Sequence, residues 1–166
     1  MGSEMCIRDR FTTSSFADGH KGKIDLKGFI VGDNKFLTDN EGNFLTFTYD
    51  GVGGLMAVEG TTFMDNASQY CLGAGTIPGK GFEMGHCKIN QMDGDTIFTY
   101  YEIPLGDSMN GTFKCLGGTG KYKGIECSGS TGYTPINSAQ ENKFASSIYF
   151  KGCLLYTSPS PRDLST

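Results

Sequence analysis

Tryptophan is absent from the 166 residues, and arginine occurs only at Arg8, Arg10 and Arg162, close to the two ends of the chain. The interior has eleven lysines but no guanidinium group, so it lacks the bidentate clamp that proteins use for phosphate and carboxylate groups. No apolar run reaches the ~18 residues that a transmembrane helix needs. The formal net charge of -4 offers no basic stripe for nucleic acid. We therefore expect neither nucleic acid nor a membrane as a partner.

Glycine and aromatic residues are abundant, with 25 Gly, 12 Phe and 8 Tyr. Glycine suits tight turns that need a positive φ, and aromatic side chains suit the half-buried faces of a sheet. The interior of roughly 140 residues is long enough for one domain with its own core. The composition therefore predicts a single all-β domain.

Both ends of the chain resemble translated sequencing adapter. The codons TGT CTC TTA TAC ACA TCT encode Cys153–Ser158. Their reverse complement, AGATGTGTATAAGAGACA, encodes Met5–Asp9 when it is read from its third base. The alternative is a flexible basic head and a Ser/Pro-rich tail that belong to the protein.

The adapter hypothesis divides the chain into a head at residues 1–10, a β-barrel domain at 11–152 and a tail at 153–166. Under this hypothesis Met1–Arg10 and Leu154–Thr166 should pack poorly and carry no site. A signal peptide is not visible, and its absence then carries no information about the compartment.

Alternating apolar and polar runs, separated by clusters of Gly, Asn and Asp, cover the interior. The clusters at residues 32–34, 40–43, 78–81, 93–95 and 117–120 are typical of hairpin turns. The predicted strands are Lys23–Val31, Phe44–Tyr49, Leu55–Met64, Gln69–Ile77, Phe82–Asn90, Thr96–Ile103, Gly111–Leu116, Gly124–Tyr133 and Phe144–Lys151.

Eight or nine consecutive antiparallel strands with short connections predict a meander. Such a meander removes its exposed edges by closing into a barrel, and a two-sheet sandwich is the alternative. A short helical turn is expected only within Ser138–Ala145.

The interior cysteines are placed symmetrically about two of the turns. Cys71 and Cys87 flank Gly79 at equal distance, and Cys115 and Cys127 flank Lys121. Each pair should therefore lie opposite across its own hairpin, close enough to form a disulfide. The pairing Cys71–Cys87 and Cys115–Cys127 predicts an oxidising compartment, secreted or periplasmic. The alternative is four reduced, buried thiols.

Familiar catalytic and metal-binding motifs are missing from the interior. The segment at residues 117–122 resembles a phosphate-binding loop, but Tyr122 stands where a Ser or Thr is needed. The acidic turn at 93–95 lacks the spacing of a calcium loop. We expect no metal and no cofactor. The weak candidates for catalysis are polar side chains on central strands: Glu59, His86, Tyr101 and Glu102.

The glutamates Glu59, Glu102 and Glu126 interrupt otherwise apolar or small-residue runs. A carboxylate inside a barrel would have a raised pKa and could act as an acid or a base. We favour the simpler interpretation, in which each glutamate faces water. His86 and Cys87 are neighbours in a strand, so their side chains should point to opposite faces and cannot form a catalytic pair.

The residues between Gly85 and Gly132 carry a family resemblance. The segments Gly85–Ile89, Met92–Phe98, Gly111–Phe113 and Gly117–Ile125 resemble the allene oxide cyclase barrel-like families, which are related in shape to lipocalins and dirigent proteins. The resemblance implies an eight-stranded antiparallel barrel whose interior holds an apolar ligand. It also implies that a homo-oligomer can form, because the related plant proteins assemble as trimers. None of the polar residues of the cyclase pocket can be matched in this sequence.

The favoured function is a noncatalytic barrel that binds a small apolar molecule in its interior. One alternative is an isomerase or cyclase that acts on such a molecule. Another is a secreted structural or interaction protein with a filled barrel. Fold alone does not decide among them.

Overall fold

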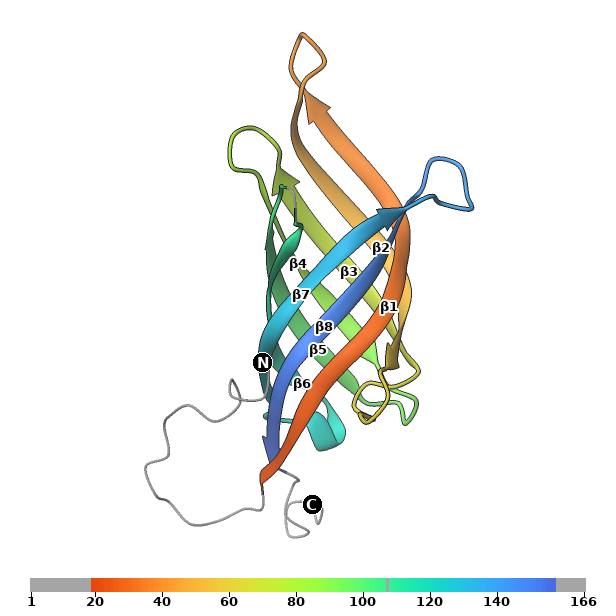
Figure 1. Cartoon of the computed structure of the whole chain (residues 1–166), viewed down its shortest axis with the longest axis vertical. Helices are drawn as coiled ribbons and strands as arrows, with labels where there is room; N and C mark the ends of the chain where they lie inside the picture. Colours follow the sequence, from red (N-terminus) through yellow and green to blue (C-terminus); the bar gives the residue numbers. More distant parts are fainter. Residues whose placement is uncertain (1–18, 107, 158–166) are drawn as a thin grey trace.

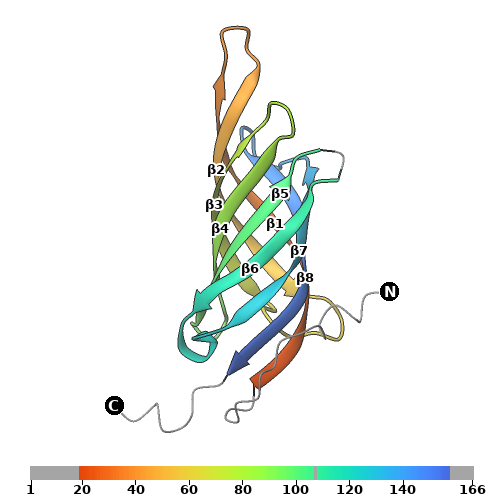
Figure 2. The ribbon, with the colours of Figure 1, turned by 90° about the vertical axis from the view of Figure 1, so that its left-hand side faces the viewer.

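The computed structural model describes residues 19–106 and 108–157. They form a closed antiparallel barrel in which each strand pairs with the next and the last pairs with the first (Figure 1; Figure 2). The prediction of an all-β, eight-stranded meander barrel is confirmed, and the sandwich alternative is wrong. The strands are β1 (Gly19–Thr38), β2 (Phe44–Ala57), β3 (Ala67–Thr76), β4 (Phe82–Asn90), β5 (Thr96–Pro104), β6 (Asn110–Gly118), β7 (Glu126–Ile136) and β8 (Phe144–Thr157).

The long strands β1 and β2 differ from the prediction. Residues 32–34 were expected to turn, but β1 continues through them to Thr38. The expected strands Phe44–Tyr49 and Leu55–Met64 are likewise one strand as far as Ala57, and the chain then leaves the sheet. Glycine explains both differences: a Cβ on Gly32 of β1 would lie 1.9 Å from the Asp50 carbonyl oxygen, and a Cβ on Gly53 of β2 would lie 1.9 Å from the Phe29 carbonyl oxygen. These glycines permit close strand contact and do not mark chain reversal.

The helical turn lies elsewhere than expected. Within Ser138–Ala145, residues 138–143 form an irregular loop and the last two residues already belong to β8, whereas residues Gly120–Tyr122 form a short 3-10 helix, η1. The Asp95 carboxylate holds this turn by accepting hydrogen bonds from Thr119 Oγ1 (3.3 Å) and from the Lys121 backbone N–H (3.2 Å). The two turn motifs of the sequence therefore bind each other at one end of the barrel.

The end of the chain was expected to pack poorly, and for Leu154 this expectation is wrong. Strand β8 continues to Thr157 and pairs with the start of β1. The Leu154 side chain is buried in the core and packs over Gly22, where a Cβ would lie 3.3 Å from Leu154 Cγ. The adapter hypothesis concerns the origin of these residues and stays a prediction. Residues 1–18 and 158–166 lie outside the described part of the chain.

Aliphatic side chains fill one half of the barrel. Ile24, Leu26, Leu55, Ile89 and Ile97 are almost completely inaccessible to solvent. They lie toward the end of the barrel where β4 turns into β5 and where η1 is found. At the opposite end, which is the upper end in Figure 1, the chain reverses between β1 and β2, β3 and β4, β5 and β6, and β7 and β8.

No membrane-spanning helix is found among residues 19–106 and 108–157.

Both predicted disulfides are confirmed. Cys71 of β3 lies directly opposite Cys87 of β4, with their Cα atoms 4.1 Å apart. Cys115 of β6 is bonded to Cys127 of β7, with a Cα–Cα distance of 4.9 Å. The symmetry of each pair about its turn was sufficient to identify these partners.

Candidate functional site

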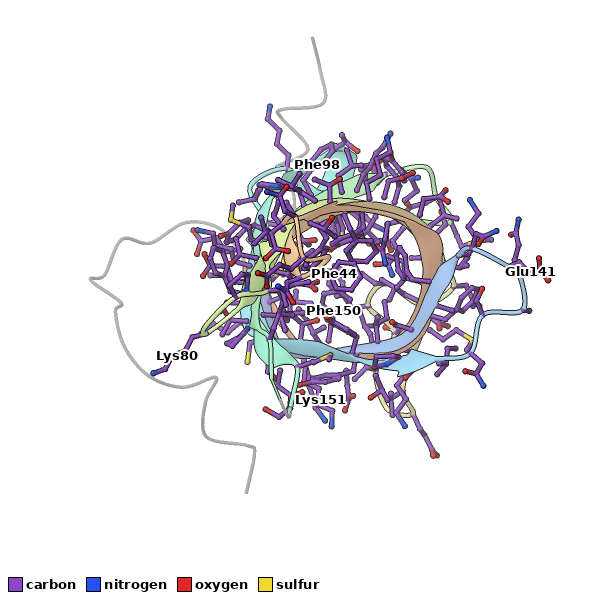
Figure 3. The ribbon with its side chains drawn as sticks, turned by 90° about the horizontal axis from the view of Figure 1, so that it is seen from above. Phe44, Lys80, Phe98, Glu141, Phe150 and Lys151 are labelled. Carbon is purple, nitrogen blue, oxygen red and sulfur yellow. A yellow bond between two sulfur atoms is a disulfide. The ribbon has the colours of Figure 1, made fainter. Side chains whose placement is uncertain are left out.

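The upper half of the barrel contains a cavity of about 340 Å³. Its wall is mainly apolar and comes from the inward-facing side chains of several strands. Asn34 and Ile136 line the cavity, and Ile136 is 50% exposed, so the cavity opens to solvent at the upper end. Seen from that end, Phe150 lies within the ring of strands, whereas Lys80 and Lys151 lie outside it (Figure 3).

Glycines on β3 and β4 make room for the aromatic rings of the cavity wall. A Cβ on Gly73 would lie 2.5 Å from the Tyr49 ring, and one on Gly75 would lie 2.6 Å from the Phe47 ring. These rings therefore pack closely against glycine backbone on the neighbouring strand. Gly85 does the same for Tyr101, whose hydroxyl oxygen would lie 2.4 Å from an added Cβ.

A buried carboxyl group lies beside the cavity. Glu83 is the second residue of β4, and its side chain points inward. Its Oε2 accepts a hydrogen bond of 2.8 Å from the Tyr133 hydroxyl of β7. Burial raises the pKa of Glu83, and the Tyr133 hydrogen bond only partly offsets this effect. Glu83 therefore holds a proton more tightly than an exposed glutamate does.

The two inward tyrosines share this environment. Burial raises the pKa of Tyr133 strongly, and the charges of Glu83 and Tyr101 raise it further. Burial alone raises the pKa of Tyr101. Both phenols therefore stay protonated. The Tyr101 hydroxyl can donate a hydrogen bond to a bound molecule, whereas the single Tyr133 proton is already donated to Glu83.

Two buried polar atoms of the cavity wall lack a hydrogen-bond partner. They are Nε2 of Gln69, which is 3% exposed, and the hydroxyl of Tyr101, which is 6% exposed. Gln69 Oε1 is 3.8 Å from Cys71 Sγ, but a disulfide sulfur has no proton to donate. A buried polar group without a partner costs about 1–3 kcal/mol. An oxygen atom of a bound molecule would supply the missing acceptor to either donor.

A charged pair lies at the opening of the cavity. Lys143, which precedes β8, lines the cavity and forms an ion pair with Asp33 of β1. The pair joins the β7–β8 loop to the outer part of β1. The cavity thus has unpaired donors in its depth, Glu83 nearer the opening and a neutralised charge pair at its rim.

Of the four weak catalytic candidates, only Tyr101 lies in the cavity. Glu102 points outward and accepts a hydrogen bond from Tyr100. Glu59 is exposed in the loop after β2. His86 is exposed on the outer face, where it lies 5.2 Å from the Tyr100 ring and contributes to a surface hollow of about 360 Å³. The structure therefore does not bring these four residues together.

The three glutamates that interrupt apolar or small-residue runs face water, as expected from the sequence. Glu59, Glu102 and Glu126 all face water. The inward carboxyl group is Glu83, which sequence reasoning missed together with Gln69 and Tyr133. A signal was present, because residues two or four apart in a strand share a face. Glu83 shares the face of Cys87, and Gln69 shares that of Cys71, whose disulfide faces the interior.

The described residues contain no group of three or more His, Cys, Asp and Glu side chains that could hold a metal ion. The chemistry that the cavity itself offers is hydrogen bonding from Gln69 and Tyr101, and proton exchange at Glu83, which Tyr133 holds by its hydrogen bond. These groups lie in an apolar wall, which strengthens their electrostatic interactions with a ligand.

The closed meander and its interior cavity define an eight-stranded antiparallel β-barrel that is open at one end. The structure is similar to that of a pterocarpan synthase dirigent protein, with a TM-score of 0.59 and 10% sequence identity, over 89% of this chain and 100% of that one. At this identity the likeness concerns the fold. No family model matches the sequence, and no curated protein matches it.

Proposed function

We propose that this protein binds one small, largely apolar molecule inside the barrel, with a hydroxyl or carbonyl oxygen at the deep end of the cavity. The unpaired donors Gln69 Nε2 and Tyr101 Oη are the observation that carries this proposal. Pockets for small molecules typically combine an apolar wall with a few polar groups that fix orientation. The cavity of about 340 Å³ also disfavours the alternative of a filled barrel.

The disulfides also indicate where the protein works. The disulfides Cys71–Cys87 and Cys115–Cys127 fit a secreted protein, because such bonds persist in oxidising surroundings. We propose that the protein works outside the cytosol, in the periplasm or beyond the cell.

The binding proposal can be tested with 4-n-propylphenol, whose hydroxyl group can accept a hydrogen bond from Gln69 or Tyr101. Ser146 lines the cavity, whereas the next residue, Ser147, is exposed on the outer face of β8. Ser146→Trp should fill the cavity and abolish binding in isothermal titration calorimetry, whereas Ser147→Trp should bind like the unmodified protein. Equal binding by both variants would place the probe outside the barrel and contradict the proposal.

A second candidate function is an isomerase or cyclase that acts on such a molecule. One observation favours it: Glu83 is buried, hydrogen bonded to Tyr133 and has a raised pKa. In its ionised form Glu83 is a stronger base than an exposed carboxylate, so it can take a proton from a carbon next to a carbonyl group while the Tyr101 hydroxyl donates a hydrogen bond to the carbonyl oxygen.

Deuterium exchange separates the two candidates. In D₂O, NMR would follow the exchange of the α-hydrogens of 4-phenyl-2-butanone, a ketone of suitable size. The catalytic candidate predicts faster exchange with the protein than without it, and loss of that acceleration in Glu83→Gln. Glu126→Gln, which changes an exposed glutamate, should exchange like the unmodified protein. Equal exchange with and without the protein would leave ligand binding as the function.

A further inference from the structure

The hairpin of β1 and β2 extends beyond the rest of the barrel. Pairing between β1 and β8 ends at Gly32 with Phe144, and pairing between β2 and β3 ends at Thr46 with Thr76. Beyond these points β1 and β2 pair with each other as far as Thr38 and Phe44, and the Ile77 N–H donates one further hydrogen bond to the Leu45 carbonyl oxygen at the base of the segment. This two-stranded segment, residues 33–45, is called the arm below, and Figure 1 shows it projecting past the other strands at the open end.

One face of the arm continues the aromatic wall of the cavity. Ring contacts run from Phe44 to Phe36 (4.7 Å between centroids), from Phe36 to Phe47 (6.2 Å) and from Phe47 to Tyr49 (6.4 Å). Phe47 and Tyr49 line the cavity, and Phe36 shares a face with Asn34, which lines it too. The aromatic surface is therefore unbroken from the cavity to the arm.

The outer part of this aromatic surface is open to solvent. Phe36 is 49% exposed and Phe44 is 50% exposed. An isolated two-stranded hairpin is only marginally stable, so large exposed aromatic side chains on it require a reason. A contiguous exposed apolar surface that joins a binding cavity is the usual arrangement of a ligand site.

We infer that the aromatic face of the arm, formed by Phe36 and Phe44, is the outer half of the ligand site. The ligand is therefore an elongated molecule. This inference rests on the proposed function. The oxygen-bearing end of the ligand lies deep in the cavity, near Gln69 and Tyr101. The apolar remainder, an alkyl chain or a flat ring system, leaves the cavity past Phe47 and lies against Phe36 and Phe44.

A series of 4-n-alkylphenols, from propyl to nonyl, tests this inference by calorimetry. Each added methylene that finds apolar surface should improve affinity by about fourfold. In the unmodified protein the gain should continue through the longest chains, because the arm offers surface beyond the cavity opening. Short chains should bind through the cavity alone.

The matched variants are Phe36→Ser on the aromatic face and Leu37→Ser on the opposite face of the same strand. Phe36→Ser should leave 4-n-propylphenol affinity unchanged and weaken 4-n-nonylphenol by about tenfold, since several methylenes lose their contact surface. Leu37→Ser should bind every member of the series like the unmodified protein. Circular dichroism and unchanged propylphenol binding report that each variant is folded.

The outcomes separate the inference from the function on which it rests. Equal loss of affinity for all chain lengths, or none for the longest, overturns the role of the arm while the cavity remains the site. Failure of every alkylphenol to bind the unmodified protein, or equal propylphenol binding by Ser146→Trp, contradicts the proposed function itself.

Discussion

The hydroxyl of Tyr133 in β7 donates a 2.8 Å hydrogen bond to Oε2 of Glu83 in β4, and the two residues are 50 positions apart in the sequence. Both side chains line the cavity, and burial raises the pKa of each. The pair places a proton-holding carboxyl group in an otherwise apolar wall. Its properties can be measured through the pH dependence of stability.

Glu83→Gln should change that pH dependence in a defined direction. Because the pKa of Glu83 is raised in the folded protein, the unfolded chain loses this proton first as the pH rises. The free energy of unfolding of the unmodified protein should therefore fall as pH rises from the ordinary glutamate pKa to the raised one. Glu83→Gln cannot ionise, so its stability relative to the unmodified protein should increase over this interval. Urea unfolding across the pH range measures the difference, and a difference that does not vary with pH contradicts the assignment. Glu126→Gln, at an exposed site, provides the control.

Removal of the two disulfides should have different consequences. Either Cys→Ala pair should lower the free energy of unfolding by roughly 3 kcal/mol, as expected for loops of this length. Only the Cys71–Cys87 bond lines the cavity, so only its removal should also weaken propylphenol binding. Denaturant unfolding and calorimetry on both double variants test this prediction. Equal effects on binding would show that the bond acts through general stability.

Gly85→Ala should destabilise the protein, because the new Cβ would lie 2.4 Å from Tyr101 Oη and 2.6 Å from the Leu72 carbonyl oxygen. The carbonyl belongs to the paired strand and cannot move independently. Overpacking of this kind costs about 1–3 kcal/mol. Gly54→Ala is the matched control, since its Cβ would approach nothing closer than 3.6 Å. Thermal unfolding of both variants measures the difference, and equal stability would show that the strands separate easily.

Asp95→Ala should loosen the turns at the lower end of the barrel, where η1 lies. It removes the acceptor of Thr119 Oγ1 and of the Lys121 N–H, with an expected loss of about 1–3 kcal/mol in the free energy of unfolding. Asp93→Asn removes only a charge that faces Lys121 at the surface, so it should change stability little. Amide hydrogen exchange at residues 119–125 should accelerate in Asp95→Ala alone.

The fold was largely predictable because local signals agree with it. The cysteines symmetric about Gly79 and Lys121 fixed two hairpins, and β4 has the bounds that its alternating pattern predicted. The long β1–β2 hairpin was not predictable, because glycine has two uses. Gly32 lies within a strand at a point of close backbone contact, but in sequence it resembles the glycine of a turn.

The candidate site was less predictable than the fold. Apolar residues are expected to point inward, but in β4 Phe82 and Met84 face outward while Glu83 faces the cavity. This inversion is tolerable only because Tyr133 satisfies the carboxyl group, and Tyr133 is distant in sequence. Only the strand register could place Gln69, Glu83 and Tyr133 around one cavity.

The most direct test of ligand binding inside the barrel is a crystal structure of the protein with 4-n-pentylphenol. The account predicts the phenolic oxygen within ~3 Å of Gln69 Nε2 or Tyr101 Oη, with the alkyl chain directed toward Phe47. An empty cavity, or probe density only in the outer hollow lined by Tyr70, Leu72 and Phe98, would contradict it.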